Sequence, residues 1–142
     1  MDPQKIVNVL NELLALEQAS LAPRLVQCTM FVSRLTVEDS NLVKGMARAS
    51  TEHAAWLAEA ILELGGVPGP RVADAQWANL HYQDVGNVLP RLIADREALI
   101  QKYTLAARYV IDEPRATELL ARICDRHQQE LSTLRPLVGQ QL

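Results

Sequence analysis

Apolar side chains recur at the three- and four-residue intervals of an α-helix in four long stretches of this sequence. The first stretch begins near Pro3, which suits the first turn of a helix, with Asp2 as its expected N-cap. Its apolar stripe runs on to Cys28, and a short connection is predicted over 34–40. The second stretch runs to a Gly-Gly-Val-Pro stop signal that starts at Gly65. This periodicity restricts the chain to long amphipathic helices.

Two further helices are predicted over 88–110 and 115–137, and a tight turn joins them. Because the first and the last connections are short, each pair of helices is expected to form an antiparallel hairpin. The connection over 65–87 is long, and a connection of that length is expected to span the whole body of a compact domain. The predicted architecture is an all-α, up-down-down-up four-helix bundle that forms a single domain over 1–142.

Composition supports this fold class and excludes several kinds of protein. Leucine and alanine account for 40 of the 142 residues, whereas aromatic residues make up 4%, and this balance favours helices over strands. A net charge of −3 argues against a nucleic-acid-binding protein, and no uncharged apolar run approaches the ~18 residues of a membrane helix. Cys28 and Cys124 are too few for a disulfide framework, so we expect reduced thiols and a cytoplasmic protein.

Several ionisable residues lie on or beside the predicted apolar stripes, where burial is costly unless they are paired or bind a cation. They are Glu17, His53, Arg96, Glu97, His127 and Glu130. In an antiparallel hairpin, residues that are equidistant from the turn lie at the same level. The midpoint of Glu17 and His53 falls in the first short connection, and that of Arg96 and Glu130 falls in the last. All four helices are therefore expected to place an ionisable group at about one level of the core.

Two hypotheses explain these groups. In the first, two carboxylates and two imidazoles bind a divalent cation, because this donor set suits iron, manganese or zinc. The ligands would be Glu17, His53, His127 and Glu130, with Glu97 as a possible fifth. In the second, no metal binds, and Arg96 pairs with Glu17 or Glu130 in a buried salt-bridge network.

Two stretches of the chain resemble the bacterioferritins, members of the ferritin-like superfamily. Residues 10–17 are similar to the first helix of that family, and residues 53–68 are similar to its second helix and its Gly-x-Pro ending. Weaker similarity covers 94–103 and 119–134. The resemblance implies a ferritin-like bundle with a terminal iron ligand at Glu17. It also implies that His53 is the histidine of the family's Glu-x-x-His motif.

The chain also departs from the di-iron site of that family. Ser50 stands where the family has a bridging glutamate, and Arg96 stands at the ligand position of the third helix, with the neighbouring glutamate one residue out of register. On the fourth helix the motif is reversed, as His127-x-x-Glu130. In an alternative register that keeps the histidine, Cys124 takes the bridging position. These departures predict an altered site for iron or zinc rather than a normal di-iron ferroxidase.

The sequence is less informative about ligands other than a metal and about partners. Thr51 aligns with the haem-ligating methionine of bacterioferritins, so haem is not expected. Trp77, His81 and Tyr82 in the long connection either pack against the helices or line a ligand surface. We expect a homo-oligomer, with a dimer favoured, and neither a nucleic acid nor a membrane as a partner.

Overall fold

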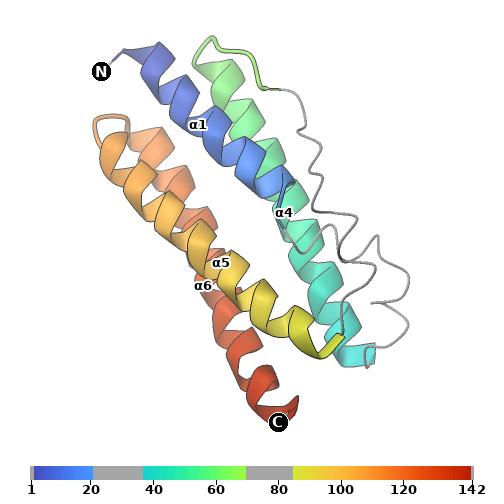
Figure 1. The fold of residues 1–142 in the computed structure, drawn as a ribbon. Coiled ribbons are helices and arrows are strands. Elements are labelled where there is room, and N and C mark those ends of the chain that lie inside the picture. Colours follow the sequence, from blue (N-terminus) through green and yellow to red (C-terminus); the bar gives the residue numbers. More distant parts are fainter. Residues whose placement is uncertain (1, 21–36, 70–84, 142) are drawn as a thin grey trace.

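The computed structural model describes residues 2–20, 37–69 and 85–141, which form four α-helices (Figure 1). Their bounds are α1 Pro3–Gln18, α4 Val37–Glu63, α5 Val85–Tyr109 and α6 Pro114–Gln141. Each of the pairs α1–α4 and α5–α6 forms a closely packed antiparallel hairpin, and α1 also packs beside α5 and α4 beside α6. The described helices thus confirm the predicted all-α, up-down-down-up bundle.

The predicted caps at two helix ends are confirmed. The Asp2 carboxylate accepts a hydrogen bond from the backbone N–H of Gln4 at 3.0 Å, in the first turn of α1. After α4, Gly65 adopts a φ of 82°, a left-handed conformation that favours glycine. The N–H groups of Gly65 and Gly66 then donate to the last carbonyls of the helix, at Leu62 and Ile61 respectively. This pair of bonds is a Schellman motif, and it ends the helix at the position that the Gly-Gly pair indicated.

Other helix boundaries differ from the prediction. The segment 34–40 was predicted as a connection, but α4 already begins at Val37. Helix α5 begins at Val85 rather than at 88, and α6 continues through Pro136 to Gln141 rather than ending at 137. Thr36 and Asp84 directly precede the two early starts and are residue types that favour the N-cap, a signal that apolar periodicity alone does not include. The predictions for Cys28, Trp77, His81 and Tyr82 lie outside the described residues.

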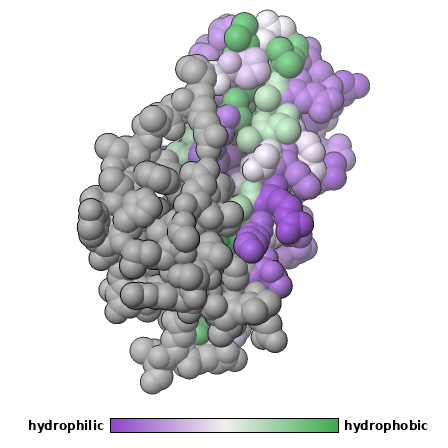
Figure 2. All heavy atoms as spheres, turned by 90° about the vertical axis from the view of Figure 1, so that its right-hand side faces the viewer, coloured by the Kyte–Doolittle hydropathy of each residue, from purple (hydrophilic) through white to green (hydrophobic). Residues whose placement is uncertain are grey.

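Buried aliphatic side chains and one tyrosine fill the centre of the bundle. The fully buried members include Leu10, Leu57, Tyr103, Leu120 and Ile123. None of the helices in the described ranges is long and apolar enough to cross a membrane. On the face that Figure 2 shows, the coloured residues are mostly hydrophilic, with separate hydrophobic residues among them.

The side chain of Asn11 fixes the first residues beyond α4 against α1. Its Nδ2 donates to the carbonyl of Val67 at 3.1 Å, and its Oδ1 accepts from the N–H of Gly69 at 2.7 Å. Both bonds are made to backbone groups that no helix satisfies. The start of the long connection is therefore tied to the middle of α1.

Candidate metal centre in the bundle core

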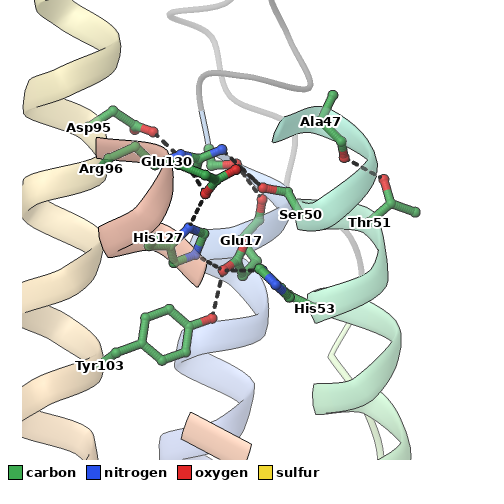
Figure 3. Close-up of polar contacts among 11 residues, drawn as sticks. Glu17, Ala47, Ser50, Thr51, His53, Asp95, Arg96, Tyr103, His127 and Glu130 are labelled. Carbon is green, nitrogen blue, oxygen red and sulfur yellow. Dashed lines mark hydrogen bonds and ion pairs between the residues drawn. The ribbon is translucent and has the colours of Figure 1, made fainter. Parts of the chain in front are cut away.

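A group of polar and ionisable side chains from all four helices is buried at one level of the bundle (Figure 3). Each member is at most 5% exposed. We call these residues the core cluster: Glu17, Ser50, His53, Arg96, His127 and Glu130. The predicted convergence of the four helices at this level is confirmed, because a salt-bridge contact joins Glu17 to His53 and another joins Arg96 to Glu130.

One carboxylate oxygen of Glu17 is the centre of the cluster. Its Oε1 accepts a hydrogen bond from the hydroxyl of Tyr103 at 2.8 Å and lies 2.5 Å from Nε2 of His127. Nδ1 of His53 is 3.4 Å from the same oxygen. Burial alone would raise the pKa of Glu17, but the hydrogen bond to His127 and the close contact with His53 outweigh it and hold this pKa well below its usual range. Glu17 is therefore an ionised carboxylate in the protein interior.

His127 lies between two carboxylates. Its Nδ1 is 2.7 Å from Oε1 of Glu130, while its Nε2 faces Glu17 on the other side of the ring. Burial would lower the pKa of His127, but the hydrogen bonds to Glu130 and Glu17 together outweigh the effect of burial. The pKa of His127 is therefore raised. Without a metal, the imidazole is therefore protonated and donates to both carboxylates.

Arg96 occupies the side of the cluster next to Glu130. Its Nη2 donates to the hydroxyl of Ser50 at 3.3 Å, and its Nε lies 3.6 Å from Oε1 of Glu130. A weaker ion pair joins Nη1 to Asp95 at 3.8 Å. The hydroxyl of Ser20 lies 3.4 Å from that of Ser50 and donates to the backbone carbonyl of Glu17. Arg96 is thus linked to the Glu17 turn through two serine hydroxyls.

Solved structures of iron proteins share this arrangement of helices. A bacterioferritin from Desulfovibrio desulfuricans, studied with its diiron site in different catalytic states, matches with a TM-score of 0.81 and 22% identity. The match covers 96% of this chain and 80% of that chain. The chain has a ferritin-like fold.

A ferritin-like, diiron-carboxylate protein from Bacillus anthracis str. Ames gives the same result. Its TM-score is 0.74 at 19% identity, and the match covers 97% of this chain and 99% of that chain. No protein-family model and no curated protein matches this sequence.

Three donor atoms of the ferritin-like bundle converge closely enough to share one metal ion. A carboxylate oxygen of Glu17 and one ring nitrogen each of His53 and His127 lie within 4.8 Å of one another. In the described ranges, Oε2 of Glu17 and Nδ1 of His53 are buried without a hydrogen-bond partner. Polar atoms that are buried without a partner are costly in a dry core. Two imidazole nitrogens and a carboxylate oxygen form a ligand set that iron, manganese and zinc accept. The residues present therefore fit a divalent metal.

Three further positions that the sequence analysis compared with metal or haem ligands lie elsewhere in the ferritin-like bundle. Glu97 is 49% exposed and pairs with Arg135 at 3.5 Å on the surface. It follows Arg96, and one residue rotates a helix by about 100°, which turns the side chain out of the core. Cys124 is a half-buried free thiol whose pKa is raised by burial, and Thr51 is exposed with its hydroxyl bonded to the carbonyl of Ala47. None of these three belongs to the core cluster.

The sequence reasoning missed the role of Tyr103. It falls within the helix predicted over 88–110, where its hydroxyl was given no partner. The third helix was expected to contribute to the same level of the core as Glu17. A buried tyrosine needs a hydrogen-bond acceptor, and the carboxylate of Glu17 could have been recognised as that acceptor. Burial, followed by the charge of Glu17, raises the pKa of Tyr103 well above its usual value, so the phenol remains a donor.

Proposed function

We propose that the core of this ferritin-like bundle binds a divalent metal, iron or zinc, through Glu17, His53 and His127. The observation that carries the proposal is the convergence of three buried donor atoms from three helices within 4.8 Å. All three residues are at most 1% exposed, so their positions are set by the packing of the bundle. Iron in this site would supply one-electron redox chemistry, and zinc would supply a Lewis acid.

Glu130 and Tyr103 would support the ligands. Glu130 accepts from Nδ1 of His127 at 2.7 Å, and a carboxylate on the far nitrogen of a histidine ligand fixes its tautomer and orients the other nitrogen. Tyr103 donates to Oε1 of Glu17 at 2.8 Å and so holds that carboxylate in place. We therefore assign Glu130, predicted as a ligand, to this supporting role. Glu97 is left out of the proposed ligand set because its side chain is on the surface.

The proposed site is altered with respect to a normal di-iron ferroxidase. A pair of irons needs several carboxylates, and the core cluster holds two, Glu17 and Glu130. A serine hydroxyl and a guanidinium occupy the rest of the same level, at Ser50 and Arg96. The proposal is accordingly one of metal binding, without an assigned reaction.

A metal-free structural core is the second candidate function, and one observation favours it. The negative charges of Glu17 and Glu130 are balanced by Arg96 and the protonated His127, which they contact directly. A buried network of this kind needs no cation for electrical neutrality. In this case the protein would serve as a scaffold or an interaction partner.

Metal content distinguishes the two candidates. The wild type and Glu17→Gln are produced with added iron and zinc and analysed for metal after desalting. The metal site predicts stoichiometric metal in the wild type and less than a tenth of it in Glu17→Gln, because the amide is a far weaker ligand. Glu12→Gln, on the exposed face of the same helix, is the matched control and should retain the metal. A wild type without metal under these conditions would favour the scaffold.

We also propose a cytoplasmic homo-oligomer, with a dimer favoured and haem absent. Cys124 is a free thiol, which fits a reducing compartment. Large apolar side chains at Leu62, Leu105 and Tyr109 are exposed on the helices, where an interface between copies would cover them. Sedimentation equilibrium should give twice the monomer mass, and a monomer at micromolar concentration would contradict the dimer.

A further inference from the structure

Arg96 is the member of the core cluster for which a metal site has no obvious use. Its side chain is fully buried, and its Nε and Nη1 atoms have no hydrogen-bond partner, although Nε lies 3.6 Å from Glu130. A guanidinium remains charged at every pH at which a protein is folded, and it has no lone pair to offer a metal. Arg96 is therefore a fixed cation beside the second carboxylate of the cluster.

We infer that Arg96 takes the place of a second cation and limits the core to one metal ion. This inference rests on the proposed function. In the described part of the chain, Glu130 is the only buried carboxylate besides Glu17, so a second ion would need it. Its Oε1 already accepts from His127 and faces Arg96. A second divalent ion would share that carboxylate with the guanidinium, and like charges repel strongly in a dry interior.

The charge of the cluster leads to the same conclusion. Two carboxylates and one guanidinium leave one net negative charge when both histidines are neutral ligands. One divalent ion then brings the cluster to a net charge of plus one, and a second would bring it to plus three. With glutamates at both Ser50 and Arg96, the cluster would hold four carboxylates and would neutralise two divalent ions.

Ser50 is the second determinant because of its place on α4. It lies one turn before His53 on the same face of the helix, and its hydroxyl accepts from Nη2 of Arg96 at 3.3 Å. It thus accepts the hydrogen bond that the guanidinium donates through Nη2, and it adds no negative charge. Arg96→Glu shortens the side chain on α5, which leaves room for the longer side chain of Ser50→Glu.

The test compares the number of ions bound by four proteins. The wild type, Ser50→Glu, Arg96→Glu and the double variant are stripped with chelator, titrated with Mn²⁺ under anaerobic conditions and desalted. Elemental analysis then gives the ratio of metal to protein. We expect one ion in the wild type and in Ser50→Glu, where Arg96 is retained. We expect two in the double variant, with the paramagnetic resonance of a coupled pair, and a second, weaker site in Arg96→Glu.

The outcomes separate this inference from the proposed function. Two ions in the wild type, or one ion in a double variant whose circular dichroism is helical, would overturn the inference. If the double variant does not fold, Arg96→Glu alone decides, and a single ion at saturating Mn²⁺ would overturn it. A wild type that binds none while the double variant binds two contradicts the proposed function, yet supports Arg96 as the group that excludes a cation.

Discussion

His127 carries a proton between Glu17 and Glu130, and this proton makes the metal-free core sensitive to pH. Its pKa is raised above the usual 6.5, so its contribution to stability is complete below pH 6.5 and is lost as the pH rises through the raised value. The pKa of Glu17 is lowered from 4.5, so its contribution is present above pH 4.5 and is lost as the pH falls below it. The two shifts place the stability maximum of the metal-free protein between these limits.

Urea unfolding of chelator-treated protein tests the alkaline side of this profile. Above pH 6.5, the free energy of unfolding is expected to fall with a slope of up to about 1.4 kcal/mol per pH unit, the value for release of one proton. His127→Gln should lack this slope because the titrating group is gone. A wild type whose stability is constant from pH 6.5 to pH 9 would show that the imidazole is not protonated between the carboxylates.

Tyr103 is the neutral donor to the same carboxylate, and its hydroxyl can be removed without changing the ring. Tyr103→Phe deletes the 2.8 Å hydrogen bond to Oε1 of Glu17, and a hydrogen bond to a charged group contributes roughly 1.5–3 kcal/mol. We expect unfolding at a correspondingly lower urea concentration. Tyr109→Phe, at a position that is 47% exposed, is the control and should stay within about 0.5 kcal/mol of the wild type. Equal effects of both changes would contradict the assigned role of Tyr103.

At the scale of elements, the α1–α4 hairpin depends on a close approach between the end of one helix and the face of the other. A Cβ atom at Gly66 would lie 2.6 and 2.8 Å from the two methyl groups of Val7 on α1. Those methyl groups belong to a β-branched side chain that is 3% exposed and has little freedom to move. The hairpin therefore requires glycine at this position for reasons of space.

Two glycine substitutions that are expected to change the stability in opposite directions test this packing. Gly66→Ala is expected to destabilise the protein by about 1–3 kcal/mol through overpacking against Val7. Gly45→Ala, inside α4 with no atom within 4 Å of the added Cβ, is expected to stabilise it by about 0.5–1 kcal/mol. Thermal unfolding measures both. A stabilising Gly66→Ala would show that α1 and α4 do not approach as closely as described.

The elements also show what sequence can and cannot indicate about boundaries. Asp2 with Pro3 and the glycine pair at Gly65 marked two helix ends correctly, because capping residues act through local backbone geometry. The start of α4 at Val37 was missed although Thr36 precedes it and acidic residues follow at 38 and 39, a pattern typical of a helix N-terminus.

At the scale of the whole molecule, the fold and the level of the core cluster were predictable, because two antiparallel hairpins leave few arrangements. Residues equidistant from each turn had to meet, and Glu17 with His53 and Arg96 with Glu130 do so. The pairing within the cluster was not predictable. Which nitrogen of His127 faces which carboxylate depends on side-chain rotamers, and these follow from packing across all four helices.

The central claim is that one divalent metal binds to Glu17, His53 and His127, and anomalous diffraction from crystals grown with Zn²⁺ tests it most directly. Data collected on both sides of the zinc absorption edge should show one strong peak in the bundle core, within about 2.0–2.2 Å of a Glu17 oxygen and one nitrogen of each histidine. Arg96 should remain against Glu130 without a peak beside it. The claim would be contradicted if crystals in excess zinc showed no peak in the core. A peak on Glu130 that leaves Glu17 unligated would also contradict it.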